Sequence, residues 1–169
     1  MATNVKVLTP KTEPAGLAVG RKEGLTPGPQ QKALNAFIGK WLTEGHTIAS
    51  ADAPAVKIVA SDVYEWVPGE FFVLHTAYGR IGDLNVGGIE VMSYDAARQK
   101  HLSQFFGSGG DTVTSDLTVH DGNWTWAAEK IRCIGVTSPD GKTMTAHHER
   151  TDDSGKWIPS MEVTLTRVE

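Results

Sequence analysis

The chain has 169 residues, of which 40% are hydrophobic and 21% are charged, with a formal net charge of -4 and a pI near 5.8. This length predicts one domain with a sizeable core, and 18 glycines with few aromatic side chains favour a turn-rich β protein. The acidic balance, with no basic cluster longer than Arg21-Lys22, argues against nucleic-acid binding, and no stretch reaches the roughly 18 apolar residues of a membrane span.

Residues 1–29 combine several prolines and glycines without any hydrophobic periodicity, which predicts an extended or mobile arm. Two roles stay open for this arm. It is either a plain flexible terminus, or a strap that covers the folded domain or exchanges with a partner subunit in a homodimer. The arm also lacks the apolar core of a secretory signal. We expect the folded domain to occupy residues 30–169.

The segment 30–38 is the one stretch with a convincing helical period. Pro29 precedes it, where a first helical turn tolerates proline, and Gly39 follows it as a stop signal. Its apolar residues share one face: Ala33, Leu34, Phe37 and Ile38. We expect a short amphipathic helix that plugs one end of the domain.

From Trp41 onward the hydrophobic period changes to two, as in β-strands. The strands are predicted over 41–49, 56–67, 70–80, 84–94, 100–107, 112–119, 123–129, 131–137, 142–151 and 157–168. Turn dipeptides such as Pro68-Gly69 and Asp121-Gly122 separate them, and connections this short leave no room for helical crossovers. The pattern predicts an all-β fold: a closed antiparallel up-and-down barrel of about ten strands with a short N-terminal helix.

Cys133 is the only cysteine, so no intrachain disulfide can form. A reducing compartment is the simplest interpretation, and we therefore expect a cytoplasmic protein. Because Cys133 lies mid-strand between Ile131 and Ile134, we interpret it as a small core residue.

Three motifs together resemble a known group of barrels. Gly39-Lys40-Trp41 with Glu44-Gly45 resembles the opening of lipocalin-like, or calycin, barrels, and the run 157–167 resembles their closing strand. The run 88–95 is similar to a central strand of the bacterial domain of unknown function 1579 family. More distant relatives in the same superfamily are fatty-acid-binding proteins and nitrobindin-like haem barrels. The resemblance implies a barrel with an internal cavity, but it does not imply a particular ligand.

The resemblance also assigns a structural role to Trp41 in the first strand and Arg167 in the last. They can meet only if these two strands are neighbours, as in a closed barrel. A guanidinium stacked on an indole is a cation–π contact worth about 0.5–2 kcal/mol, and here it would close one end of the barrel.

Alternate residues of a barrel strand point into the lumen, so the sequence limits which side chains can meet a ligand. Trp124 and Trp126 share one face of their strand and are expected to face inward. If Met161, Val163 and Leu165 also face inward, the last strand is mostly apolar on its inner side. The faces of 71–78 stay ambiguous. The candidate ligand-binding side chains are Tyr64, Trp66, His75, Tyr78, Glu90, Phe106, Trp126, Met144, His148 and Met161.

Six histidines raise the question of a metal site, but the sequence contains no paired-ligand motif. A site would have to combine separate strands, for instance His75, His101 and His148, and separate histidines without a metal are the ordinary explanation. Haem is a more specific alternative than a metal site built from separate histidines, since nitrobindin-like barrels use a histidine near the closing strand as iron ligand. The matching position here is Met161, with His147 or His148 one strand earlier. The leading expectation is no cofactor.

Glu90 lies mid-strand among apolar residues, an unusual place for a carboxylate. If it faces inward, burial would raise its pKa and make it a candidate acid or base, partnered by His75 or His148. The alternative is a solvent-facing Glu90 that pairs across strands with a lysine or arginine.

Three functions therefore stay open. The first is the binding of a small, largely apolar molecule in the lumen. The second is an enzyme, such as an isomerase, cyclase or hydrolase, with Glu90, His75 and His148 as candidate catalytic residues. The third is a non-catalytic interaction protein, expected as a homodimer.

Overall fold

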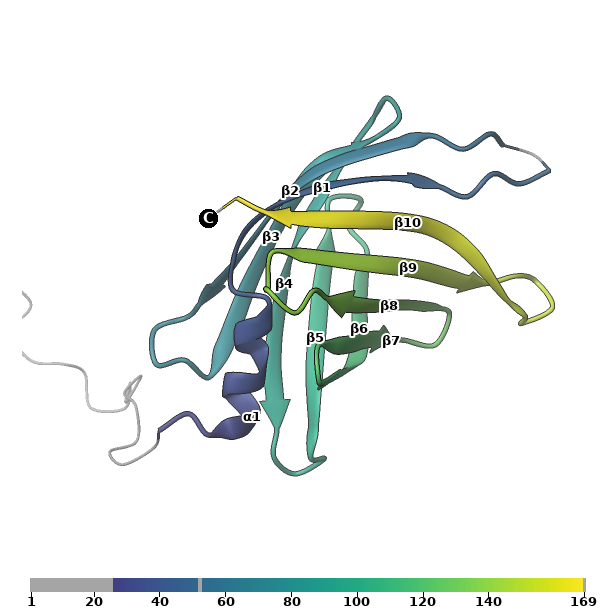
Figure 1. Cartoon of the computed structure of the whole chain (residues 1–169). Coiled ribbons are helices and arrows are strands. Elements are labelled where there is room, and N and C mark those ends of the chain that lie inside the picture. Colours follow the sequence, from purple (N-terminus) through teal and green to yellow (C-terminus); the bar gives the residue numbers. More distant parts are fainter. Residues whose placement is uncertain (1–25, 52, 169) are drawn as a thin grey trace, which may run out of the picture.

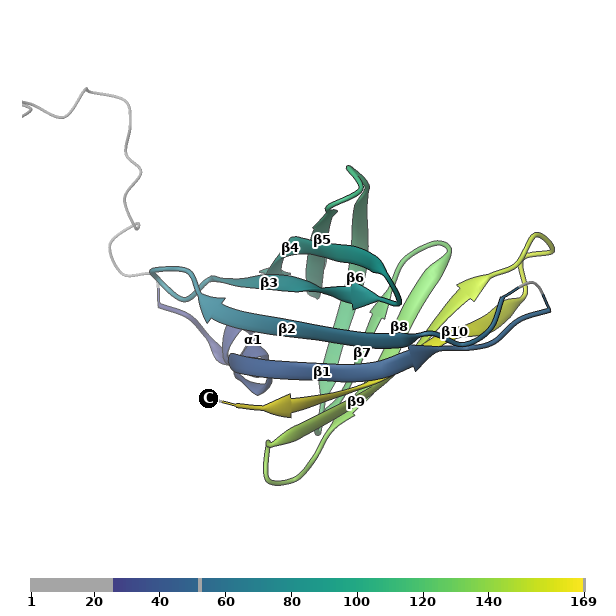
Figure 2. The same cartoon turned by 90° about the horizontal axis from the view of Figure 1, so that it is seen from above.

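The computed structural model describes residues 26–51 and 53–168 and shows an antiparallel β-barrel with one short helical segment at its N-terminal side (Figure 1). The strands are β1 (Gly39–Thr47), β2 (Lys57–Trp66), β3 (Phe72–Ile81), β4 (Leu84–Asp95), β5 (Lys100–Gly107), β6 (Thr112–His120), β7 (Asn123–Ala127), β8 (Ile131–Thr137), β9 (Thr143–Thr151) and β10 (Trp157–Arg167). Each strand pairs with the next along the chain, and β1 pairs with β10. The predicted closed up-and-down barrel is confirmed (Figure 2).

Short hairpins occur at the predicted turn dipeptides, whereas the connection from β1 to β2 is longer. Between β6 and β7, Asp121 and Gly122 form a two-residue loop in which both have positive φ, 49° and 76°. Two successive positive φ angles define the type I′ turn, whose twist matches that of the flanking strands. Asp-Gly is among the dipeptides that adopt this turn with the least conformational strain, so the sequence predicted this hairpin.

The predicted helix over 30–38 is present but is tighter and shorter than expected. An α-helical turn, α1 (Pro29–Lys32), passes into a 3-10 turn, η1 (Ala33–Ala36). The tighter winding is seen in the last turn, where the amide of Phe37 donates a hydrogen bond to the carbonyl of Leu34, three residues earlier. This tighter winding buries Leu34 and Phe37 completely against the barrel.

The helical segment closes one end of the barrel, as predicted (Figure 1). The Nε2 of His101 on β5 donates to the carbonyl of Gln30 at 2.7 Å, and the indole of Trp66 on β2 donates to Asn35 Oδ1 at 3.0 Å. Strands far apart in the sequence therefore hold the same short helix.

Trp41 and Arg167 meet at this end across the β1–β10 seam, where they are register partners. The guanidinium carbon of Arg167 lies 4.1 Å from the ring centre of Trp41. The indole nitrogen of Trp41 donates to the carbonyl of Phe37 at 2.8 Å, and Arg167 donates to the carbonyls of Ile38 and Gly141. The predicted cation–π contact is confirmed, and it ties both ends of the barrel sequence to the helix.

The core fills the barrel from the helix side and leaves a lumen beyond it. Leu34, Phe37, Trp41, Val73 and Met92 are among its fully buried members. No helix among the residues that the structure describes is long and apolar enough to cross a membrane. The predicted N-terminal arm falls largely outside the described residues, and its role and the homodimer stay predictions.

Candidate functional site

A cavity of about 360 Å³ occupies the barrel lumen. It runs from Phe37 at the helix to Arg132 and Glu149 near the hairpins at the other end. Its lining divides by sector of the barrel. The strands β7 to β10 supply mostly apolar side chains: Trp124, Trp126, Cys133, Met144, Ala146, Met161, Val163 and Leu165. We call this surface the apolar wall.

Strands β1 to β5 supply a chain of five buried polar side chains, one from each strand, which we call the polar belt. Its members, in strand order, are Thr43, Asp62, His75, Glu90 and Ser103. They share one layer because inward-facing residues of neighbouring strands lie side by side when the register is regular. His75 and Glu90, for example, are direct register partners.

Hydrogen bonds join the polar belt from end to end. His75 contacts both carboxylates, with Nδ1 at 2.8 Å from Glu90 Oε2 and Nε2 at 3.0 Å from Asp62 Oδ1. The hydroxyl of Ser103 donates to Glu90, and the hydroxyl of Thr43 donates to Asp62. No member is more than 8% exposed, so the network is shielded from bulk solvent.

His75 is the centre of the belt and is positively charged at neutral pH. Burial alone would lower the pKa of His75, but hydrogen bonds from its ring to Asp62 and Glu90, with the negative charges of both, raise it from 6.5 to about 9. The imidazolium therefore donates from both nitrogens, one to each carboxylate. This saturation makes His75 a fixed charge and leaves it no free lone pair with which to act as a base.

Tyr64 on β2 covers one face of the His75 ring. The two rings are nearly parallel, 6° apart in orientation, with centres 3.9 Å from each other. Burial, followed by the charges of Asp62 and Glu90, raises the pKa of Tyr64, so the phenol stays neutral. Phe37 stacks on Tyr64 in turn, with ring centres 5.9 Å apart, which links the belt to the helix.

Cys133 and His148 form a second polar pair, on the apolar wall. Cys133 Sγ lies 3.3 Å from His148 Nε2, and the two are register partners of β8 and β9. Burial and then the charge of Glu90 raise the pKa of the Cys133 thiol, whereas burial and then His147 lower the pKa of His148 to about 4. The pair is thus a neutral thiol beside a neutral imidazole. A neutral thiol is a weak nucleophile. Cys133 is half-buried and packs against the core, in agreement with its interpretation as a small core residue, and it also lines the lumen.

The sequence of residues 26–167 matches the family described as "Protein of unknown function (DUF1579)". The chain belongs to this family. The resemblance stated from the run 88–95 and the barrel motifs is therefore confirmed. None of the curated proteins compared with this DUF1579 chain matches it.

Solved structures share the barrel at low sequence identity. Rv2717c from M. tuberculosis is 12% identical with a TM-score of 0.62, covering 84% of this chain and 99% of that protein. The S-type phycobiliprotein lyase CPES from Guillardia theta is 10% identical with a TM-score of 0.52, covering 83% and 93%. These likenesses establish a common fold for the DUF1579 chain and its neighbours.

Most of the predicted ligand-binding side chains line the lumen of this DUF1579 barrel. They are Tyr64, His75, Glu90, Trp126, Met144, His148 and Met161. Of the two orientations left open for Glu90, the inward one is correct, and Glu90 is 7% exposed.

The other three predicted positions do not line this cavity. Tyr78 and Phe106 point outward, with exposed fractions of 64% and 43%. Tyr78 is an odd number of residues from the inward His75, so strand alternation puts it on the other face. The same rule puts Phe105, the register partner of Glu90, in the lumen in place of Phe106. Trp66 faces the helix, where it bonds Asn35.

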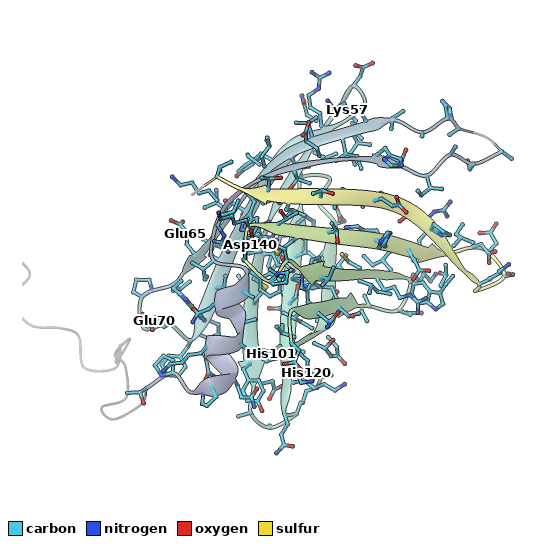
Figure 3. The ribbon with its side chains drawn as sticks, in the orientation of Figure 1. Lys57, Glu65, Glu70, His101, His120 and Asp140 are labelled. Atoms are coloured by element: carbon cyan, nitrogen blue, oxygen red, sulfur yellow. The ribbon has the colours of Figure 1, made fainter. Side chains whose placement is uncertain are left out.

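The histidines considered for a metal site are not brought together. His75 and His148 line the lumen, whereas His101 lies beside the helix (Figure 3). Among the described residues, no group of three or more His, Cys, Asp and Glu side chains is arranged to hold a metal ion.

The two positions considered for haem do lie side by side. Met161 and His148 are register partners of β10 and β9, and both line the lumen. His147 points outward and contacts Glu162 at 3.2 Å. Burial lowers the pKa of His148 to about 4, so its imidazole is neutral and keeps a lone pair, although its Nε2 already contacts the Cys133 thiol at 3.3 Å.

Sequence reasoning missed Asp62, Thr43 and Ser103. A signal existed for Asp62, which lies mid-strand in 57–66 beside Val63, the same unusual setting that drew attention to Glu90. Thr43 and Ser103 carried no such signal, because short hydroxyl residues are common on both faces of strands. Only the register reveals that each lies next to a buried carboxylate.

Proposed function

We propose that this protein binds one small, largely apolar molecule in its barrel lumen. The observation that carries the proposal is the cavity of about 360 Å³ bounded on one side by the apolar wall. Cavities of this size, apolar with a few convergent polar groups, are the usual form of a small-molecule site.

The polar belt supports the same function from the opposite side of the lumen. Its groups are held by mutual hydrogen bonds, so they are positioned before any ligand arrives. Preorganised polar groups orient a ligand without a further entropic cost at the moment of binding. An apolar molecule with one polar end would place that end at the belt and its body on the apolar wall.

The direct test is native mass spectrometry of protein purified from its own host. We expect a population of the intact protein with an additional mass of one small molecule, which unfolding releases for identification. Apo protein alone, with no mass shift after incubation with host lipid and metabolite extracts, would contradict the proposal.

Haem is the special case of this proposal that an absorption spectrum decides. The neutral His148 beside Met161 on the lumen wall is the observation in its favour. A haem protein would show a Soret band in freshly purified material or after addition of hemin. A flat spectrum in both samples removes haem and leaves the lumen to other ligands.

An enzyme is the second candidate function, because Glu90 and His75 converge within hydrogen-bond distance in the lumen. The geometry restricts the chemistry. Ser103 bonds Glu90 and not His75, so the belt contains no hydroxyl activated by a histidine, which disfavours hydrolysis through a serine nucleophile. Proton transfer through Glu90, as in an isomerase or cyclase, is the reaction class that remains.

Turnover can be sought without knowing the substrate. Host extract incubated with the protein would be followed by NMR, and a Glu90→Gln variant would serve as the control. Metabolite signals that change with the native protein but not with the variant would support catalysis. Equal spectra would leave ligand binding as the function.

A further inference from the structure

The negative charges of the side chains that line the lumen outnumber the positive charges. The carboxylates are Asp62, Glu90 and Glu149, and the cations are His75 and Arg132. Arg132 and Glu149 form an ion pair with each other near the hairpin end. Two carboxylates in the polar belt are thus left with one imidazolium between them, an excess of one negative charge.

Nothing else in the belt neutralises this charge. Thr43 and Ser103 donate hydrogen bonds to the carboxylates but carry no charge. A buried charge without a partner is unfavourable, and the penalty is relieved when an opposite charge enters the same low-dielectric space. The lumen is therefore complementary to a cation, and it repels the carboxylate of a fatty acid.

Aromatic rings in the lumen lining suit the apolar part of the same ligand. Phe37, Trp124 and Trp126 form a cluster in the lumen lining, with ring centres 4.8 to 5.9 Å apart. The faces of these rings and the methionines of the same lining, Met144 and Met161, accommodate hydrocarbon. An organic cation can thus satisfy both sides of the lumen at once, which an inorganic ion cannot.

We propose that the lumen ligand is a protonated amine on an apolar body, with its ammonium group at the carboxylates of Asp62 and Glu90 and its hydrocarbon on the apolar wall. This inference rests on the proposed function of lumen binding and names the class of ligand. The ammonium group donates to carboxylate oxygens, the strong, charge-assisted form of the hydrogen bond.

The test compares three probes with the same eight-carbon tail, namely octylamine, octanol and octanoate, by isothermal titration calorimetry near neutral pH. We expect octylamine to bind at least tenfold more tightly than octanol, and octanoate to bind most weakly. If octanol or octanoate binds as tightly as octylamine, the amine inference is overturned while lumen binding stands. If none of the three binds, both the inference and the proposed function fail.

Two variants test whether the carboxylate of Glu90 is responsible for the preference for octylamine. Glu90→Gln removes the excess charge from the lumen, and we expect it to weaken octylamine binding at least tenfold while octanol changes less than about twofold. Glu44→Gln is the matched control, since it removes the same charge from the outer face of β1, where Glu44 pairs with Lys57. An equal loss in both variants, or no loss in Glu90→Gln, would contradict the placement. Asp62→Asn repeats the test if Glu90→Gln does not fold, and the ranking of the probes on the native protein decides the ligand class in either case.

Discussion

At the scale of single residues, His75 explains why two carboxylates can be buried in one small lumen. It lies between Asp62 and Glu90 and donates to both, and Tyr64 covers its ring. Without the imidazolium, the two carboxylates would be left with only hydroxyl donors. A buried cation between two anions is thus a structural requirement of the polar belt as well as a feature of the site.

This role predicts a pH dependence of stability. The pKa of His75 is about 9 in the folded protein and 6.5 for the unfolded chain, so its contribution is complete below pH 6.5 and is lost as the pH rises through 9. The shift corresponds to about 3 kcal/mol of the free energy of unfolding. The free energy of unfolding, measured by urea titration at a series of pH values from 6.5 to above 9, would show this loss.

The variant His75→Gln separates the contribution of His75 to stability from that of other titrating groups. It should be less stable than the native protein near neutral pH by about 3–5 kcal/mol, because the carboxylates lose their charged partner. It should also lack the alkaline decline. The control His120→Gln changes a largely solvated histidine beside the β6–β7 turn and should retain the native pH profile. A native alkaline decline that persists in His75→Gln would assign it to other groups.

At the scale of elements, one side chain joins the paired strands β1 and β10 to the helix. Arg167 stacks on Trp41 and donates to carbonyls from three segments: Ala36 in the helix, Ile38 after it, and Gly141 in the β8–β9 turn. Carbonyls at the end of a helix have no donor within the helix itself, so they need one from elsewhere. Arg167 therefore caps the helix and closes the barrel at the same time.

Arg167→Ala should lower the free energy of unfolding by about 2–4 kcal/mol, from the lost stacking and the unpaired carbonyls. Arg167→Lys should recover only part of this, because an ammonium cannot reach several carbonyls in a fixed fork. Urea midpoints measure both variants. Arg80→Ala is the matched control, since Arg80 lies on the surface with one exposed ion pair and should cost less than about 1 kcal/mol. Equal costs at the two arginines would contradict the capping role.

At the scale of the whole molecule, closure of the barrel is what creates a lumen with two different sides. The strands β1 to β5 carry the polar belt, and β7 to β10 carry the apolar wall. Neither sector is a binding site by itself, because a flat sheet would expose both to water. The closed order of strands places them across a common space.

Filling this space should abolish binding without unfolding the protein. Ala146 is 2% exposed and lies on the apolar wall of β9, so the Ala146→Phe side chain would extend into the cavity. We expect retained thermal unfolding cooperativity and loss of the bound mass in native mass spectrometry. The neighbouring Thr145→Phe adds the same ring on the exposed face of β9 and should leave binding intact. A ligand that persists in Ala146→Phe would place the site outside the lumen.

Much of this architecture follows from local sequence. The hairpin dipeptides, the period-two strands, and the pairing of Trp41 with Arg167 predicted a closed barrel, because turn chemistry and strand alternation depend on neighbouring residues. The helix was predicted in place but not in its 3-10 geometry, which depends on the space that the barrel leaves for Phe37.

The candidate site shows where local information ends. Glu90 was recognised from the sequence as an unusual residue and His75 as its candidate partner, but the orientation of both was open. Tyr78 and Phe106, which were also candidates for ligand binding, face outward. By itself the sequence determined the barrel, its closure and the supply of buried polar groups. The tertiary structure alone decided that Thr43, Asp62, His75, Glu90 and Ser103 form one connected belt, because cross-strand register joins residues that no local pattern relates.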